Sequence, residues 1–179
     1  NAINFLVDHC MSTVLLCTAT QPLLGNVEQT KGALNLVREN EIMPDVSRLF
    51  VDLKRVHVHD RRKYPAWTNS EISGLAVQQV KENGSCLVVV NTKRAARVLF
   101  RQMKEYEFDV FHLSTGMCPA HRKQVLETIR HMLDHSKPIL CVSTQLIEAG
   151  IDISFQSVVR TLAGLDSIAQ AAGRCNRHG

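Results

Sequence analysis

Short apolar runs, rich in β-branched residues, alternate with helical segments along most of this 179-residue chain. The runs Cys86 to Val90 and Pro138 to Val142 are continuously apolar, as is typical of strands that are buried on both faces of a parallel sheet. Strands that alternate with helices at these spacings form right-handed βαβ units. The pattern therefore predicts an α/β fold with a parallel sheet that is flanked by helices.

Local signals place the remaining elements. Thr68-x-x-Glu71 is a capping box and predicts a helix that ends at Gly84. A second helix is expected from Arg94 to Tyr106 on its apolar periodicity. Pro119 suits a first helical turn and predicts a third helix to about Leu133. Further strands are predicted at residues 13–17, 109–113 and 156–162, an extended segment at 49–59, and a short helix from residue 166.

The chain is expected to contain parts of two domains. Residues 1–20 are interpreted as the C-terminal remnant of a first α/β domain. Residues 21–48 contain Pro22, Gly25, Gly32 and Pro44, which break regular structure, and are interpreted as an interdomain linker. Residues 49–179 are then a second α/β domain, truncated at its C-terminal end.

Composition sets wide bounds. The net charge of +4 mildly favours an acidic partner such as nucleic acid and decides nothing alone. No apolar run approaches the roughly 20 residues of a membrane span, so no membrane contact is expected. None of the six cysteines forms a C-x-x-C pair, which favours buried reduced thiols in a cytoplasmic protein over disulfides or a metal site.

Small polar residues follow four of the predicted strands. Ligands of an open parallel sheet bind beyond the carboxyl ends of its strands, and short hydroxyls and backbone N–H groups are good phosphate ligands. The same residue types also cap helices, which is the simpler interpretation for any single one. Their occurrence after four strands favours a binding rim. These residues are Thr18, Thr20, Asn91, Thr92, Ser114, Thr115, Ser143 and Thr144.

Two arginines close to the C-terminus carry the strongest signal. Arg174 and Arg177 are spaced i, i+3, so a helix would place them on one face, with Gln170 one turn earlier. Converging guanidinium groups repel each other unless an anion lies between them, and arginine forks match the oxygens of a polyphosphate. A solvated basic helix end that complements the helix dipole is the alternative.

These segments resemble the motifs of superfamily-2 helicases. Gln170-x-x-Gly173-Arg174-x-x-Arg177 is similar to their sixth motif, Thr144 to Asp152 to their fifth, and Thr18-Ala19-Thr20 to their third. With Leu162 to Ser167 in between, the set most resembles the helicase part of the CRISPR-associated helicase–nuclease of type I systems. The resemblance implies the end of a first RecA-like domain, then a second RecA-like domain.

The resemblance also implies roles for the matching residues. Arg177 would be the arginine finger that reaches the γ-phosphate across an interdomain cleft. Arg174 would contact the same phosphate, and Gln170 would position the nucleotide or the attacking water. Other implied roles are nucleotide binding by Gly150, Asp152 and Gly173, DNA-strand contacts by Asn91, Thr92, Ser114, Thr115, Ser143 and Thr144, and domain coupling by Thr18 and Thr20. Ala171 stands where many relatives have an arginine.

The sequence lacks a G-x-x-x-x-G-K-[ST] phosphate loop and an acidic pair that follows a strand. ATP and Mg²⁺ are therefore expected in a longer parent protein, and the chain alone is expected to be inactive as an ATPase. The expected partners are single-stranded DNA, a CRISPR effector complex, the rest of the parent and a regulatory or inhibitor protein. Two alternatives remain: an RNA helicase of the same superfamily, and a protein-interaction module that a regulator binds.

Overall fold

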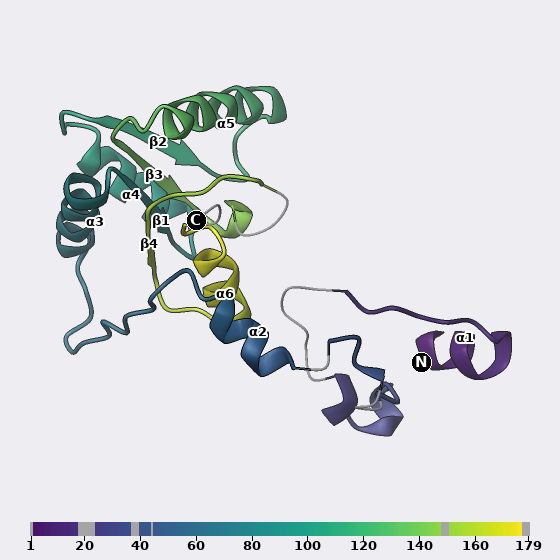
Figure 1. Ribbon diagram of the computed structural model, residues 1–179. Helices are drawn as coiled ribbons and strands as arrows, with labels where there is room; N and C mark the ends of the chain where they lie inside the picture. The colour runs from purple at the N-terminus through teal and green to yellow at the C-terminus, as the bar shows by residue number, and fades with distance from the viewer. Residues whose placement is uncertain (1, 18–23, 37–39, 44, 148–150, 177–179) are drawn as a thin grey trace. The chain divides into compact units, whose positions relative to one another are not determined.

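A computed structural model describes residues 2–17, 24–36, 40–43, 45–147 and 151–176 (Figure 1). The chain divides into two compact units, Asn1–Lys54 and Arg55–Gly179. None of the helices among the described residues is long and apolar enough to cross a membrane.

The second unit is built on a four-stranded parallel sheet (Figure 1). Its strands are β1 (Ser85–Val89), β2 (Asp109–Leu113), β3 (Ile139–Ser143) and β4 (Ser157–Arg160), in the order β2-β3-β1-β4. All three pairings are parallel. Every residue of β1 and β3 is buried, because these strands lie in the middle of the sheet with a layer on each face. This burial explains the continuous apolar runs and confirms the predicted fold class.

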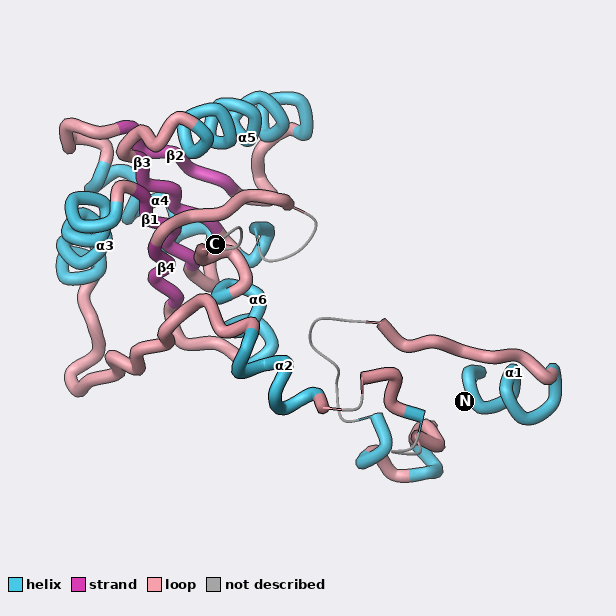
Figure 2. The backbone as a smooth tube through the Cα atoms, in the orientation of Figure 1, coloured by secondary structure: helices cyan, strands magenta, loops and turns pink. Residues whose placement is uncertain are grey.

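Helices cover both faces of this sheet (Figure 2). The helices α3 (Asn69–Asn83) and α4 (Lys93–Met103) pack on one face, where they bury Cys86 and Val88 of β1. The helix α5 (Pro119–Asp134) packs on the opposite face, where β1 contributes Leu87 and Val89. The alternation of side chains along a strand thus feeds two separate cores.

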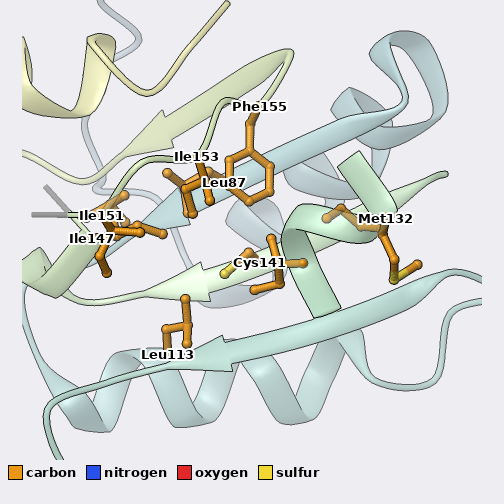
Figure 3. Close-up of a cluster of buried hydrophobic side chains, with 11 residues drawn as sticks. Leu87, Leu113, Met132, Cys141, Ile147, Ile151, Ile153 and Phe155 are labelled. Atoms are coloured by element: carbon orange, nitrogen blue, oxygen red, sulfur yellow. The ribbon is translucent and has the colours of Figure 1, made fainter. Parts of the chain in front are cut away.

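The core under α5 is completed by the segment that follows β3. A 3₁₀ turn, η4 (Gln145–Ile147), buries Ile147, and beyond the undescribed residues 148–150 the chain buries Ile151, Ile153 and Phe155. Figure 3 shows Ile147, Ile151 and Ile153 gathered with Leu87 on this side of the sheet. The helix α6 (Leu165–Ala172) follows β4 and packs against it.

Most predicted helix boundaries are confirmed. The Thr68 hydroxyl accepts a hydrogen bond from the Glu71 N–H at 3.2 Å, and the Glu71 carboxylate accepts one from the Thr68 N–H at 2.8 Å. The helix ends at Gly84, whose φ of +85° favours glycine. Helix α5 begins at Pro119 as expected, and α4 ends at Met103, three residues before the predicted Tyr106.

The first unit contains the helices α1 (Ala2–Cys10) and α2 (Val46–Asp52) and the 3₁₀ turns η1 (Leu24–Asn26) and η2 (Gln29–Lys31). The predicted strand at residues 13–17 is wrong: these residues form no regular structure, and Leu15 is 67% exposed. A strand needs a partner, and the described part of this unit contains no other strand.

The prediction of an extended segment at residues 49–59 is wrong at its start. The helix α2 occupies its first four residues, and residues 54–59 form no regular structure. Asp45 caps α2 by accepting a hydrogen bond from the Arg48 N–H at 2.9 Å. This local cap, and not the alternation of apolar residues, sets the conformation here.

The prediction of buried thiols is correct for two cysteines. Cys86 and Cys141 are buried in the sheet, and burial raises the pKa of the Cys86 thiol to about 12 and that of Cys141 further still. Cys10, Cys17 and Cys118 are exposed, and all six cysteines are free. Cys17 lies in the segment that was wrongly predicted to be a strand, whereas Cys10 belongs to α1 and Cys118 precedes α5.

Candidate functional site

The carboxyl ends of the strands lie at one edge of the sheet. The register aligns Leu113 of β2, Ser143 of β3 and Val89 of β1 in one row. The chain stays paired one residue beyond each end, since the Thr144 N–H bonds the Leu113 carbonyl at 3.3 Å and the Val90 N–H bonds the Ser143 carbonyl at 2.9 Å. The structure therefore brings the polar residues that follow β1, β2 and β3 to one rim, as the parallel topology predicts.

Three of the rim residues are buried. Ser114, Ser143 and Thr144 are 2%, 0% and 8% exposed. The Ser143 hydroxyl donates to the Thr144 carbonyl at 3.0 Å, and the Ser114 carbonyl accepts from the Met117 N–H at 3.1 Å. These residues shape the rim from inside, whereas Thr115, next along the chain, is exposed on it.

Asn91 and Thr92 lie on the rim and also stabilise it. The Asn91 amide donates to the Leu162 carbonyl at 2.8 Å and accepts from the Arg160 guanidinium at 2.7 Å, which joins the end of β1 to the end of β4. The Thr92 hydroxyl accepts from the Ala95 N–H at 3.1 Å and caps α4. Both side chains are exposed, so these bonds leave them accessible to a ligand.

The segment that resembles the fifth helicase motif begins at this rim. The Thr144 carbonyl accepts from the Ile147 N–H at 3.3 Å and starts the turn η4. Asp152 is exposed, and its backbone carbonyl accepts from the Arg130 side chain at 3.2 Å, which fixes the segment to α5. Gly150 lies outside the described residues.

The segment that resembles the sixth motif differs from the expectation. Gln170 lies half-buried on α6, but this helix ends at Ala172 with Gly173 as its C-cap. The N–H groups of Arg174 and Cys175 bond the carbonyls of Ala171 and Ala172 in tighter turns. The prediction that Gln170 and Arg174 share a helical face is therefore wrong, because the helix stops first. Gly173 was the available signal, since glycine often follows the last helical residue.

Arg174 is buried and joins the two motif segments. It is 8% exposed, and its Nε donates to the Ile147 carbonyl at 3.0 Å. The backbone on each side of it pairs with Phe155: the Phe155 N–H bonds the Arg174 carbonyl at 2.9 Å, and the Asn176 N–H bonds the Phe155 carbonyl at 2.8 Å. The segment after α6 is thus held against the segment after β3.

The remaining expected site residues are not described. Arg177 follows directly on Asn176, and Thr18 and Thr20 belong to the first unit; all three lie outside the described residues. Across the described ranges, no group of three or more His, Cys, Asp or Glu side chains is arranged to hold a metal ion.

Sequence comparisons identify the family. The family described as CRISPR-associated nuclease/helicase Cas3, C-terminal, matches residues 82–179. The Cas3 protein of Haloferax volcanii is 48% identical over 65 residues, which are 36% of this chain and 7% of that protein. The Cas3 protein of Methanothermobacter thermautotrophicus is 27% identical over 180 residues, which cover 97% of this chain and 21% of that protein. The chain therefore spans only a small part of these relatives.

Solved structures support the same fold. The crystal structure of T. fusca Cas3 with AMPPNP has a TM-score of 0.56 at 20% identity and covers 68% of this chain and 15% of its own. A structure titled CRISPR RNA-guided surveillance complex, pre-nicking, gives 0.52 at 20% identity over 68% of this chain and 15% of its own. The C-terminal domain of the DEAD-box protein Dbp5 gives 0.52 at 20% identity, covering 62% of this chain and 63% of its own. The fold is RecA-like, and the resemblance drawn from the motifs is confirmed: the chain belongs to the CRISPR-associated nuclease/helicase Cas3 family, whose C-terminal part it matches.

Proposed function

We propose that this chain is part of an ATP-dependent single-stranded DNA translocase or helicase of CRISPR interference. Within that enzyme the chain would supply the arginine finger and part of the DNA track. The observation that carries the proposal is the junction of the two motif segments. There the Arg174 side chain bonds the turn that follows β3, and the flanking backbone pairs with Phe155.

The junction holds Asn176, the last described residue before Arg177. Asn176 is bonded to Phe155, whose ring is fully buried. A finger that starts from a packed segment loses less entropy when it meets a phosphate. ATP and Mg²⁺, held by the rest of the parent, would supply the phosphoryl group and its bridging charge. The guanidinium of Arg177 would neutralise the charge that develops during transfer, an effect of roughly 10³ to 10⁵ in turnover.

Arg174, Gln170 and Asp152 would act beside the finger. The Nε of Arg174 donates to the Ile147 carbonyl, so a contact of its Nη groups with the same phosphate would link nucleotide binding to the position of η4. Gln170 would position the nucleotide or the attacking water. Asp152 would contact the ribose or couple to the arginines of the sixth motif. The backbone at Gly150 and Gly173 would lie close to the nucleotide.

The rim would form part of the DNA track. Thr115, Asn91 and Thr92 are exposed there and would contact the strand through their side chains. Ser114, Ser143 and Thr144 are buried and would contribute mainly through backbone groups, which suit phosphate oxygens. We further propose that residues 1–20 end a first motor domain, that 21–48 are the linker, that 49–179 belong to the second domain, and that Thr18 and Thr20 couple the two.

The finger is tested in the longer parent. Arg177→Ala should lower DNA-stimulated ATP hydrolysis by about 10³-fold or more while ATP binding, measured by equilibrium titration, is retained. Lys137→Ala, a change at an exposed position outside the motifs, is the control and should leave both unchanged. Hydrolysis by Arg177→Ala at the wild-type rate would sink the proposal. Stimulation by RNA and not by DNA would replace the substrate with RNA.

The proposed partner is a CRISPR effector complex. Support comes from the relative whose structure is titled as a CRISPR RNA-guided surveillance complex. A parent immobilised on beads should retain a purified effector complex bound to its target DNA. Equal retention on beads that carry an unrelated helicase would contradict this partnership.

A further inference from the structure

Helix α4 carries a row of cations outside the motifs. Arg97, Arg101 and Lys104 are spaced i, i+4 and i+7, so they lie on one side of the helix, and all three are exposed. None of them forms an ion pair with a residue that the structure describes. Exposed cations that form no ion pair are available to an external anion.

These cations border a hollow between α4, β2 and the turn that follows β2. Its volume is about 440 Å³, and none of the described residues that line it is acidic. Phe100 and Met117 are half-buried and give it an apolar surface. The lining residues are Arg97, Phe100, Arg101, Lys104, His112, Ser114, Gly116 and Met117.

His112 contributes a buried polar atom without a partner. Its Nε2 is inaccessible to solvent and makes no hydrogen bond to any described residue. Its ring lies against Phe100, with centroids 5.6 Å apart. Burial, and secondly the nearby charge of Arg97, lower the pKa of His112, so the ring is neutral at pH 7. A buried nitrogen that lacks a partner is costly, so His112 is a polar group of this hollow whose bonding is incomplete.

The hollow continues into the rim. A side chain built on Gly116 would place its Cβ 3.7 Å from the Ser114 hydroxyl and 4.0 Å from Nη2 of Arg97. The Arg97 guanidinium thus lies over the turn that begins at the carboxyl end of β2. Gly116, the residue after Thr115, therefore lies next to the first cation of the row.

We propose that this hollow binds the phosphates of a single-stranded nucleic acid as the strand leaves the rim, an inference that rests on the proposed function. From Arg97 to Lys104 the helix rises about 10 Å, close to the length of roughly three stacked nucleotides. A row of cations beside an aromatic ring is the arrangement that binds single strands without sequence preference. A small anion would instead favour cations that converge on one point.

The test compares two variants of equal charge. R97Q/R101Q/K104Q removes the row, whereas K81Q/K123Q/K137Q removes three exposed lysines from elsewhere on the same unit. Binding of the 179-residue chain to a fluorescent oligothymidylate of about 20 nucleotides is followed by anisotropy between about 50 and 200 mM salt. Thermal unfolding of both variants verifies that each is folded.

The row variant should bind about tenfold more weakly at the lowest salt, and its slope of log affinity against log salt should shrink by about 2, since each strand phosphate contributes about 0.7. The matched variant should retain the wild-type slope. Equal slopes for the two variants would overturn the inference and leave the proposed function standing, because the finger is tested separately through hydrolysis. If wild-type chain showed no salt-dependent binding, the inference and the proposed DNA track would both fail.

A titration with inorganic pyrophosphate separates a strand from a small anion. Pyrophosphate binding that the row variant loses, together with unchanged oligothymidylate binding, would identify a small-anion site and overturn the inference. Weak pyrophosphate binding that is equal in both variants supports the strand.

Discussion

Two arginines of the second unit have different surroundings. Arg174, which belongs to a recognisable helicase motif, is 8% exposed and donates its Nε to the Ile147 carbonyl. Arg97, which belongs to no motif, is exposed and forms no ion pair with a described residue. A buried guanidinium is tolerable only when it is hydrogen-bonded, so Arg174 is committed to the protein in this conformation. The comparison teaches that motif membership does not by itself identify which arginine is available to a ligand.

The largest effect is expected from removing the packing beneath Arg174. Phe155 is fully buried and its backbone bonds both Arg174 and Asn176, so Phe155→Ala should cost about 3–5 kcal/mol of unfolding free energy. Denaturant unfolding measures this loss, and amide exchange at Asn176 should become faster than in wild type. Leu165→Ala, at an 83% exposed position of α6, is the control and should change stability by less than about 0.5 kcal/mol. Slow exchange at Asn176 in Phe155→Ala would show that the junction does not depend on this core.

The next effect separates the two arginines directly. Arg174→Ala leaves the Ile147 carbonyl without its donor and should cost about 2 kcal/mol. Arg97→Ala should change stability by less than about 0.5 kcal/mol, since its side chain is exposed. Oligothymidylate binding should show the reverse order, with Arg97→Ala the weaker binder. Equal stability losses for the two variants would break the comparison.

The sequence predicted the middle of the sheet because burial of β1 and β3 on two faces leaves continuous apolar runs. All four strands of the second unit and their helices follow from apolar runs, a capping box and one proline at a helix start. The position of the rim could be predicted once the strands were assigned, because parallel strands end at the same edge of the sheet. The family resemblance came from the motif residues and their order, which the fold alone does not determine.

The errors arose where tertiary contacts or a cap outweigh a local pattern. Residues 13–17 look like a strand, yet no strand pairs with them among the described residues. Residues 49–59 were predicted to be extended, yet the Asp45 cap starts a helix that continues to Asp52. Spacing suggested that Arg174 continues α6, whereas Gly173 ends the helix and the side chain turns to Ile147. The hollow beside α4 combines residues 97–104 with 112–117, and only the packing of α4 against β2 brings them together.

The smallest effect on stability is expected at Lys63, which is exposed like Arg97 but forms an ion pair with Glu71. Its ammonium binds the Glu71 carboxylate and lies 4.6 Å from the centroid of the Trp67 ring. This hydrogen bond, with those from Thr68, lowers the pKa of Glu71 from 4.5 to about 2. Because the folded-state pKa is depressed, the stabilisation is complete above about pH 4.5 and is lost as the pH falls towards about 2.

Lys63→Ala should therefore raise the pKa of Glu71, measured by NMR titration of its side-chain carboxyl, without restoring it fully to 4.5. The Thr68 N–H and hydroxyl still donate to the carboxylate at 2.8 and 2.9 Å and keep part of the depression. The variant should also lose less stability than wild type between about pH 4.5 and 2, and its deficit at pH 7 should be smaller than that of Arg174→Ala, because an exposed pair is screened by solvent. A Glu71 pKa that stays at about 2 in Lys63→Ala would assign the whole depression to the helix cap, and Lys63 would then be as available to a ligand as the cations of α4.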